Sequence, residues 1–475
     1  MSEYLSNIGL EIHIQLDTRS KAFCQCPTSF GAEPNSQVCP VCLGYPGVLP
    51  SLNGEAMFMA YKVARALNCR LSERSFFDRK NYFYPDMPKN YQISQFHAPV
   101  GVEGFLDFPF AESSHRARIH DVHLEEDAGK MIHAGGVSLL DFNRAGTPLL
   151  EIVTEPDLRG PEQTEAFILY FRRFVRYLQV SSGNMEEGSL RRDANISLRR
   201  PGQDLGTKVE VKNLNSSRFV KLALGYEQER QSKILARGGS VLQETRLWNE
   251  NRDLTLLMRS KEEAQDYRYF PEPDLPPFRP DRKFLERVDA EIPELPLDRQ
   301  LRFVEDYGLN SEAASFLTEE KERADFFERT VEAGASPTEC ARRLAGDVSR
   351  ILNRKRLSLA DSALTPRRLA ELLEMLDSGR IHDKIAKKVL PLIFEEDKSP
   401  GTIVAERNLQ QITSEAQIRT LIRGILDEEP AAAQAAAAEE TKIIGYFMGR
   451  LMQRSGALAE PRLSRTILEQ ELKER

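Results

Sequence analysis

Three short segments in the first 215 residues alternate strictly between polar and aliphatic side chains. This period of two predicts β-strands with one buried face. The segments span residues 10–16, 193–199 and 208–212. In the first, Glu11, His13 and Gln15 share one face and four aliphatic side chains share the other. A solvated sheet face needs only polarity, whereas these faces repeat carboxylates, an imidazole and cations, which are groups that bind metal ions and phosphate. The pattern therefore indicates an open catalytic trough rather than an inert wet surface.

The spacing of apolar residues divides the chain into three parts. Residues 1–295 mix alternating strands, turn-rich stretches and helices, and a proline-dense passage ends them. Residues 296–405 carry apolar side chains three and four apart, which predicts the core of a helix bundle. Residues 406–475 form a smaller helical unit with an Ala-rich stretch, 431–438, that is either a helix or a flexible connector. We therefore expect an α+β fold in which a mixed domain is followed by two all-α domains.

Composition and charge restrict the possible environments. The 475 residues contain no run of the roughly 18 apolar residues that a membrane helix requires. The N-terminal segment has neither a basic start nor an apolar core, so we expect no secretory signal, no membrane association and a cytoplasmic protein. A net charge of −7 gives no general attraction to nucleic acid. Any RNA contact must then come from local basic clusters.

Four of the six cysteines lie close together in the sequence, in two pairs separated by a turn-rich loop. They are Cys24, Cys26, Cys39 and Cys42. Two close pairs of thiolates fit a closed tetrahedral zinc site, although the first pair is one residue tighter than the usual spacing. The loop at 24–42 is therefore either a structural zinc site or a reduced, metal-free loop. A redox role requires a reactive, exposed pair and is disfavoured.

Acidic residues mark a second candidate site. The segment 123–130 contains the consecutive acids Glu125, Glu126 and Asp127, which repel one another unless a cation lies among them. Hard oxygen ligands of this kind suit magnesium, and a solvated acidic loop is the alternative. Glu151 lies inside an otherwise aliphatic strand, where a lone buried carboxylate is costly. A partner or a metal ion is therefore expected beside Glu151.

Common phosphate-binding motifs are missing from the sequence. It contains no P-loop and no G-x-G-x-x-G. It also contains no G-x-S-x-G elbow, so we expect that it lacks a nucleophile for hydrolysing an amide. A nucleotide would have to bind on the sheet face, through metal ions and charged side chains. The candidates for ATP and substrate binding are Lys80, Arg191, Arg192, Asp193, Lys208, Glu210 and Lys212.

Several longer motifs together resemble a known family, the B subunits of aspartyl/glutamyl-tRNA amidotransferases (GatB). The motifs are G-L-E-I-H at 9–13, F-G-A-E-P-N at 30–35, R-K-N-Y-F-Y-P-D at 79–86, Y-Q-I-S-Q at 91–95, 123–130, 143–151, M-E-E-G-S-L-R at 185–191, 210–216 and 266–275. The resemblance is dense up to about residue 280 and covers the helical remainder in outline.

This resemblance implies an ATP-dependent ligase that forms a C–N bond. The side-chain carboxylate of glutamate or aspartate mischarged onto tRNA(Gln) or tRNA(Asn) is phosphorylated, and ammonia then displaces the phosphate. Ammonia comes from glutamine hydrolysed on an amidase A subunit, and a small C subunit completes a heterotrimer. The missing amidase nucleophile agrees with that division of labour. The implied cofactors are ATP, Mg²⁺ and a structural Zn²⁺.

The resemblance also implies roles for individual residues. Glu11, His13, Glu126 and Glu151 are expected to be catalytic and to hold magnesium. Glu125 is the nearest competitor of Glu126, because strand parity alone does not say which of the two faces inward. The first domain is expected to resemble the glutamine synthetase and guanido kinase fold, an antiparallel sheet whose open face forms a cradle for nucleotide and metals.

The C-terminal unit resembles a tail domain that binds tRNA. Its phosphate-contact candidates are Lys442, Arg450, Arg454, Arg462 and Arg465. One departure is the neutral-to-acidic stretch 431–440, where family tails often carry a basic, glycine-containing loop. The sequence does not choose between Glu-tRNA(Gln) and Asp-tRNA(Asn). A catalytically inactive, zinc-stabilised tRNA-binding scaffold is the alternative function, and a ligase for a small molecule is disfavoured by the basic tail.

Overall fold

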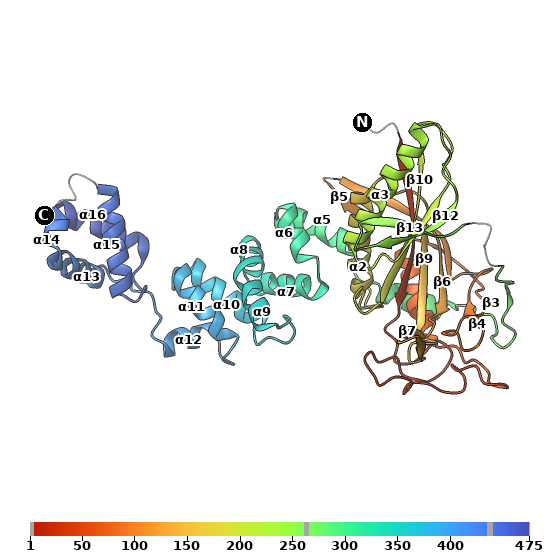
Figure 1. The fold of residues 1–475 in the computed structure, drawn as a ribbon. Coiled ribbons are helices and arrows are strands. Elements are labelled where there is room, and N and C mark those ends of the chain that lie inside the picture. The colour runs from red at the N-terminus through yellow and green to blue at the C-terminus, as the bar shows by residue number, and fades with distance from the viewer. Residues whose placement is uncertain (1–3, 112, 261–265, 435–439, 475) are drawn as a thin grey trace. The chain divides into compact units, whose positions relative to one another are not determined.

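The computed structural model describes residues 4–111, 113–260, 266–434 and 440–474, and it divides into two compact units, Met1–Asp298 and Arg299–Arg475. The first unit is mixed α and β with a mostly antiparallel sheet, and the second is helical (Figure 1). The Ala-rich stretch 431–438 extends beyond the described residues from position 435. No helix in the described ranges is long and apolar enough to cross a membrane.

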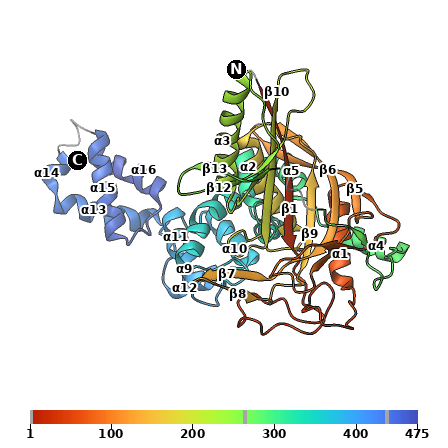
Figure 2. The same cartoon turned by 45° about the vertical axis from the view of Figure 1, so that its right-hand side comes forward.

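A nine-stranded sheet forms the first unit. From one edge to the other its strands are β13 (Leu254–Ser260), β12 (Glu244–Asn249), β11 (Val209–Lys212), β10 (Leu190–Arg199), β1 (Leu5–Gln15), β9 (Pro148–Thr154), β6 (Ser113–Glu126), β5 (Gly101–Phe110) and β2 (Arg70–Leu71). All neighbours are antiparallel except β11 and β12. The first strand of the chain thus lies near the middle of the sheet, between β10 and β9 (Figure 2).

In the described part of this unit, two smaller sheets and the helices α1 to α4 accompany the large sheet. The sheets are β14 (Phe270–Pro271) with β3 (Asp78–Asn81) and β4 (Tyr91–Ser94), and the hairpin of β7 (Lys130–Ala134) with β8 (Val137–Asp141). The helices are α1 (Gly54–Ala66), α2 (Pro161–Tyr177), α3 (Ser217–Ala236) and α4 (Arg282–Glu291). The starts of α1 and α3 are fixed by side-chain caps, because Asn53 and Ser216 accept hydrogen bonds from the first helical amides.

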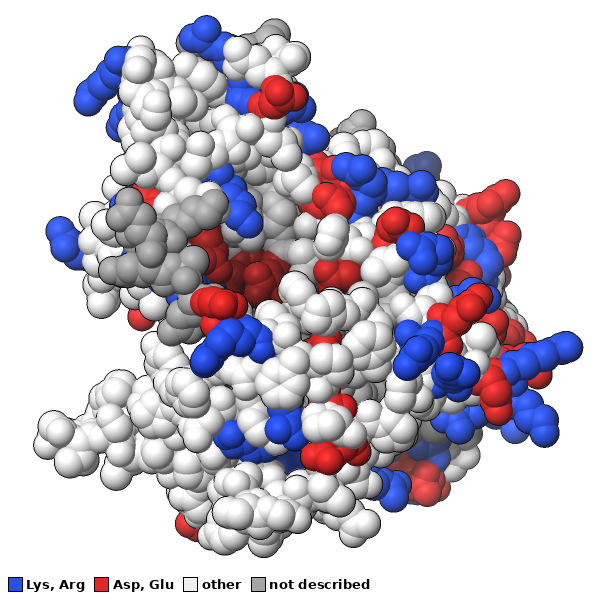
Figure 3. All heavy atoms as spheres, turned by 90° about the vertical axis from the view of Figure 1, so that its right-hand side faces the viewer, with Lys and Arg blue, Asp and Glu red and all other residues white. Residues whose placement is uncertain are grey.

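The aliphatic face of the sheet packs against these helices. Ile8, Leu10, Ile12 and Ile14 of β1 are at most 1% exposed and belong to one hydrophobic core with apolar side chains of α1, α2 and α3. The polar side chains of the same strands therefore face the other side of the sheet, away from these helices. On the face drawn in Figure 3, acidic side chains lie together in a hollow with basic side chains around it.

The second unit consists of short helices, and a π-helical segment, Leu344–Val348, joins two of them without a turn. They are α5 (Pro296–Tyr307, which begins in the first unit), α6 (Ser311–Leu317), α7 (Lys321–Glu332), α8 (Pro337–Arg343), α9 (Ser349–Lys355), α10 (Pro366–Asp377), α11 (Asp383–Ile393), α12 (Pro400–Glu406), α13 (Glu415–Glu428), α14 (Pro430–Gln434), α15 (Glu440–Arg454) and α16 (Pro461–Lys473). Their buried side chains form two core clusters, one within residues 303–404 and one within 418–468. The division of this unit into domains 296–405 and 406–475 stays a prediction.

Candidate functional site

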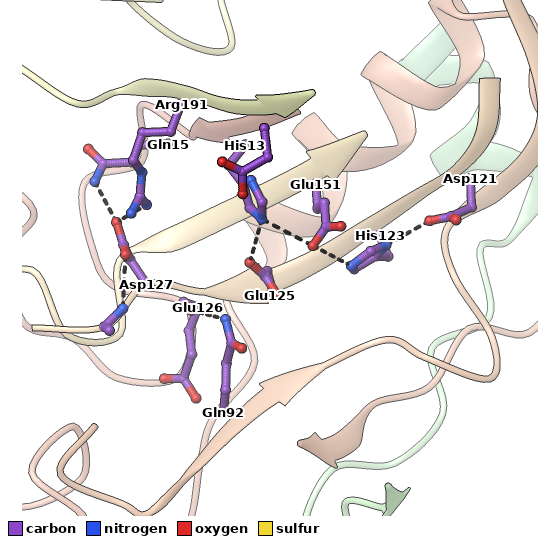
Figure 4. Close-up of polar contacts among 12 residues, drawn as sticks. His13, Gln15, Gln92, Asp121, His123, Glu125, Glu126, Asp127, Glu151 and Arg191 are labelled. Atoms are coloured by element: carbon purple, nitrogen blue, oxygen red, sulfur yellow. Dashed lines mark hydrogen bonds and ion pairs between the residues drawn. The ribbon is translucent and has the colours of Figure 1, made fainter. Parts of the chain in front are cut away.

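Glu151 is the centre of a cluster of ligand-type side chains on the open face of the sheet (Figure 4). The strand register places it opposite His13 of β1 on one side and His123 of β6 on the other. Its Oε2 atom lies 3.1 Å from the Nε2 atom of each histidine. Glu125 Oε1 is 3.5 Å from His13 Nε2. Glu11, His13 and Glu151 form one group that could hold a metal ion, and His123, Glu125 and Glu151 form another; within each group the ligand atoms lie within 4.8 Å of one another.

Burial and crowding give these groups unusual pKa values. Burial, reinforced by the charge of Glu151, raises the pKa of Glu11 to about 7. Burial also opposes the charge on Glu151, but His123 and His13 outweigh it and hold the pKa of Glu151 well below its usual range. Burial alone would lower the pKa of each histidine, yet the surrounding carboxylates raise both. The metal-free cluster therefore retains protons on Glu11 and on both imidazoles at a pH where unperturbed side chains would have lost more of them.

Glu125 and Glu126 take different positions, which the sequence left open. Glu125 is 2% exposed and lies in the cluster with His13. Glu126, expected to be the magnesium ligand, points away from it and accepts hydrogen bonds from Lys89 Nζ and from the backbone amide of Ile93, the latter at 2.9 Å (Figure 4). The structure thus brings together Glu11, His13, Glu125 and Glu151, and it leaves Glu126 outside the group.

His123 and Asp121 are site residues that the sequence reasoning missed. The His123 Nδ1 atom lies 2.7 Å from Asp121 Oδ1, so one ring nitrogen contacts Asp121 while the other contacts Glu151. The alternation in β6 contained this information, because Asp121, His123 and Glu125 are two residues apart and therefore share a face.

Charged pairs continue the open face on both sides of the cluster. Asp127 accepts hydrogen bonds from Arg191 at 2.5 Å and from Gln15 at 2.8 Å. These contacts hold the pKa of Asp127 below its usual value even though burial opposes the charge. Farther along the sheet, Lys212 Nζ contacts Asp193 at 2.5 Å and belongs to the same polar face.

Glu210 and Lys208 lie at the same end of the face. Glu210 contacts Lys212 at 2.9 Å and accepts a hydrogen bond from Thr245 of β12 at 2.7 Å. Lys208 precedes β11 and is exposed. Lys212 contacts the carboxylates of both Asp193 and Glu210. Their negative charges raise the pKa of Lys212, although burial opposes this effect.

Arg192 is an exception among the expected nucleotide-binding residues, and its expected place on the open face is wrong. It alternates with Arg191 and Asp193 and so faces the helix-covered core, where it is 4% exposed. All three guanidinium nitrogens lack a hydrogen-bond partner among the described residues. Burial lowers the pKa of Arg192 to about 10. A nucleotide on the open face has no access to this side chain.

Aromatic side chains and Lys80 form a wall next to the cluster. Lys80 Nζ lies 5.2 Å from the ring centroid of Tyr267, and the rings of Phe96 and Tyr269 stack at 4.1 Å. Burial opposes the charge of Lys80, but Glu125 and neighbouring groups raise its pKa. The acidic cluster thus favours the charged form of Lys80.

The four clustered cysteines come together in space. Cys24, Cys26, Cys39 and Cys42 bring their Sγ atoms within 4.8 Å of one another. The backbone amide of Cys39 donates to Cys42 Sγ at 3.2 Å, and the fully buried Lys21 lies 3.6 Å from the same sulfur. A hydrogen bond from the Cys24 thiol and these contacts lower the pKa of Cys42 to about 4. The arrangement can hold a metal ion.

The basic candidates of the tail are largely engaged with glutamates. Arg450 contacts Glu429 at 3.2 Å, Arg454 contacts Glu428 at 2.5 Å, and Arg465 contacts Glu469 at 2.9 Å. Arg462 is exposed at the start of α16. Lys442 belongs to α15, but its side chain lies outside the described residues.

Comparisons with known proteins agree with the resemblance. Residues 6–286 match the family model described as the GatB/GatE catalytic domain, and residues 325–472 match the one described as the GatB domain. A protein from Persephonella marina, named as the B subunit of aspartyl/glutamyl-tRNA(Asn/Gln) amidotransferase, is 45% identical over 473 residues, covering 99% of this chain and 100% of that protein. Proteins of the same name from Brevibacillus brevis and Solidesulfovibrio magneticus are each 46% identical over 475 residues, covering 99% of this chain and 99% and 100% of their own lengths. With both parts of the chain matched at this level, the protein belongs to the family of B subunits of aspartyl/glutamyl-tRNA(Asn/Gln) amidotransferases.

Proposed function

We propose that this chain is the activating subunit of a tRNA-dependent amidotransferase. It phosphorylates, at the expense of ATP, the side-chain carboxylate of glutamate or aspartate attached to tRNA(Gln) or tRNA(Asn). Ammonia then replaces the phosphate to give the amide. The observation that carries this proposal is the cluster of Glu11, His13, Glu125 and Glu151 on the polar face of the sheet, in which Glu125 and Glu151 are buried. The names of the relatives support the substrate class.

The residues of the cluster fit a magnesium ion. Three carboxylates supply hard oxygen donors, and the Oε2 atom of Glu125 is buried without a hydrogen-bond partner among the described residues. When bound, magnesium screens the substrate carboxylate and the γ-phosphate from each other. The sequence favoured Glu126 for this role, but the position of Glu125 beside His13 supports Glu125 instead.

The cations around the cluster support the binding of phosphate groups. Lys80, Arg191 and Lys212 each lie on the open face and are held by a ring or a carboxylate. Holding these side chains in place lowers the entropy lost when they contact an anion. We assign them to ATP and the phosphorylated substrate, together with Asp193 and Glu210, which orient Lys212.

The open face of a large, mostly antiparallel sheet also supports a resemblance to the glutamine synthetase and guanido kinase fold. In such a cradle the helices cover one face and the other remains free for nucleotide and metals. The same comparison is chemically reasonable, because glutamine synthetase also phosphorylates a carboxylate before amination.

Structural zinc and two partner subunits complete the proposal. The four thiols of Cys24, Cys26, Cys39 and Cys42 form the tetrahedral donor set that zinc prefers. We infer an amidase A subunit as the source of ammonia and a small C subunit in a heterotrimer. For tRNA, the exposed Arg462 is a proposed tail contact, while Arg450, Arg454 and Arg465 would have to exchange glutamate partners for phosphate.

The test is amidation by the chain assembled with its amidase partner. Glu-tRNA(Gln) and Asp-tRNA(Asn) are each supplied with glutamine in one arm and with ammonium chloride in the other. Glu125→Gln should abolish amide formation and ADP release in both arms while tRNA binding persists. Glu103→Gln, which alters an exposed carboxylate paired with Arg70, is the matched control and should retain both activities. Normal amidation by Glu125→Gln would overturn the proposal, and tRNA binding without ATP turnover by the unmodified protein would support the inactive scaffold.

A further inference from the structure

Two buried glutamines contact the backbone on either side of Glu125. The side-chain oxygen of Gln95, Oε1, accepts a hydrogen bond from the backbone amide of Leu124 at 2.8 Å. The side-chain nitrogen of Gln92, Nε2, donates to the backbone carbonyl of Glu126 at 2.6 Å (Figure 4). Gln92 is 6% exposed and Gln95 is 1% exposed, so water has little access to either contact. The backbone before and after the proposed magnesium ligand is therefore held by side chains.

The two glutamines take the place of a neighbouring strand at the end of β6. The pairing of β6 with β5 ends at Val122 and Gly101, before Glu125 is reached. On the other side, Pro148 of β9 lies opposite Glu126 and has no amide hydrogen to donate. β5 therefore does not extend alongside residues 124–126, and the side-chain amides of residues 92 and 95 supply partners for the buried backbone groups there.

The side chain of Gln95 is itself held in one orientation. Its Nε2 atom donates to Ser75 Oγ at 2.5 Å, and the Ser75 hydroxyl donates to the backbone carbonyl of Ala98 at 2.9 Å. Because the hydroxyl uses its one hydrogen for Ala98, it accepts from Gln95, and the Gln95 oxygen faces the Leu124 amide. Ser75 is fully buried. This chain of contacts fixes the Gln95 amide, as is required of a side chain that positions another residue.

The same contacts join two sheets that carry different parts of the site. Gln92 lies in β4 directly opposite Lys80 of β3, in the three-stranded sheet, whereas Glu125 lies in β6 of the nine-stranded sheet. The Ile93 amide of β4 adds a contact to the Glu126 carboxylate at 2.9 Å. Lys80 is proposed to contact phosphate groups, and Glu125 is proposed to bind magnesium. The position of one relative to the other therefore depends on how β4 is attached to β6.

We propose that Gln92 and Gln95 are positioning residues for carboxylate activation: their side-chain amides fix the backbone of residues 124–126 so that the Glu125 carboxylate reaches magnesium. Both act through Glu125 and not by contact with the cation. The proposal rests on the function proposed above, because it requires Glu125 to bind the cation. The simpler alternative is that the two amides only satisfy buried backbone groups and contribute to stability alone. The two differ in whether cation affinity depends on these side chains.

Titration of the purified full-length chain with Mn²⁺, which suits carboxylate ligands, tests the proposal. Gln95→Met keeps a side chain of similar length but has no oxygen to accept from the Leu124 amide. We expect it to bind Mn²⁺ about 10–100-fold more weakly by calorimetry, the loss typical of residues that orient a metal ligand. Gln231→Met is the matched control, because Gln231 is a fully buried glutamine of α3 that contacts Glu227. The control should lose stability but retain the affinity for Mn²⁺.

Two milder variants keep the proposal testable if Gln95→Met does not fold. Ser75→Ala leaves Gln95 in place but removes the contact that orients its amide. Gln92→Met removes the donor to the Glu126 carbonyl. Each should weaken Mn²⁺ binding, by less than Gln95→Met. An affinity equal to that of the unmodified protein in both would overturn the proposal, even if both variants lost stability.

Amidation by the assembled complex separates failure of this proposal from failure of the proposed function. Gln95→Met should raise the Mg²⁺ concentration for half-maximal ADP release by about tenfold and leave the KM for glutamine unchanged. A lower kcat with an unchanged half-maximal Mg²⁺ concentration would overturn the positioning role. If Glu125→Gln abolishes amidation while Gln95→Met behaves like the unmodified protein, the positioning role fails and the function stands. If Glu125→Gln amidates normally, the function itself fails.

Discussion

Glu125 and Glu126 are consecutive in the chain, yet their carboxylates lie on opposite faces of the central sheet. Glu125 approaches His13 in the trough, while Glu126 is held by Lys89 and by the Ile93 amide on the other side. Because a strand alternates at every residue, only one of two adjacent acids can reach a given face. Two chemically identical side chains therefore have separable roles.

We predict opposite effects for the two conservative substitutions. Glu125→Gln should weaken Mn²⁺ binding at least about tenfold, since it removes a charged ligand. Glu126→Gln should leave Mn²⁺ affinity within about twofold but lower the free energy of unfolding by roughly 1–3 kcal/mol, because Lys89 loses its buried charged partner. Calorimetry and urea unfolding measure the two effects. Strong loss of Mn²⁺ affinity in Glu126→Gln would instead identify Glu126 as the metal ligand, as the sequence analysis expected.

Replacing Arg192 should stabilise the protein. The guanidinium is buried without a hydrogen-bond partner among the described residues, so Arg192→Leu removes the cost of burying a polar group and should raise the stability of the first unit by about 1–3 kcal/mol. The neighbouring Arg191→Leu is the matched control and should destabilise, because it leaves Asp127 without its 2.5 Å contact. A lower melting temperature for Arg192→Leu would show that the guanidinium has a favourable partner in solution.

Metal binding should become tighter as the pH rises from 6 to 8. The pKa of Glu11 is raised to about 7 and the pKa values of His13 and His123 are also raised, so the metal-free site holds protons near neutral pH. A cation must displace them, which means that protons are released and that the apparent affinity falls as the pH falls. Calorimetry of Mn²⁺ binding in buffers of different ionisation enthalpy counts the protons. Proton uptake, or an affinity independent of pH, would contradict the raised pKa values.

The same shift in Glu11 gives a stability prediction with a definite sign. Its pKa is about 7 in the folded, metal-free protein and near 4.5 for an unperturbed side chain. The folded state therefore holds this proton more tightly, and the corresponding stability is present below pH 4.5 and is lost as the pH rises towards 7. Glu11→Gln should remove this part of the pH dependence, as measured by urea unfolding from pH 5 to 8 without divalent cations. An unchanged profile in Glu11→Gln would refute the shift.

The cysteine cluster should hold one zinc ion per chain. Elemental analysis of the purified protein should find one equivalent, and Cys42→Ser should lose it because only three of the four thiolate ligands of a closed tetrahedral site remain. Cys340→Ala, in the helical unit, is the control and should retain zinc. A zinc-free protein with an intact fold would establish the reduced, metal-free loop instead.

Much of the site could be predicted from the sequence because its residues alternate within strands. The segments 10–16 and 193–199 fall within or overlap the strands β1 and β10, and their polar positions do face the trough. The preference for Glu126 over Glu125 came from the family resemblance, whereas the structure places Glu125 beside His13 and Glu126 against Lys89. Counting from Val122 and Leu124, which are buried, places Glu125 on the polar face. The same reasoning would have excluded Arg192, which is in phase with Ala194 and Ile196.

Strand order could not be predicted in the same way. Nothing in residues 5–15 indicates that their neighbours are residues 148–154 and 190–199, because pairing between distant segments depends on the packing of the whole core. For this reason the contact between Glu151 and two histidines could not be predicted from the sequence, although a partner for Glu151 was expected. The contact between Asp121 and His123, two residues apart, was missed for a simpler reason, since His123 was not considered a ligand.

The place of β1 in the sheet has a consequence for biosynthesis. β1 leaves the ribosome before both of its neighbours, β9 and β10, which are made more than a hundred residues later. Until then its aliphatic side chains, such as Leu10 and Ile12, have no sheet to join. The nascent chain therefore exposes this hydrophobic segment through much of its synthesis. Chaperones that bind hydrophobic segments should stay attached until β10 has emerged.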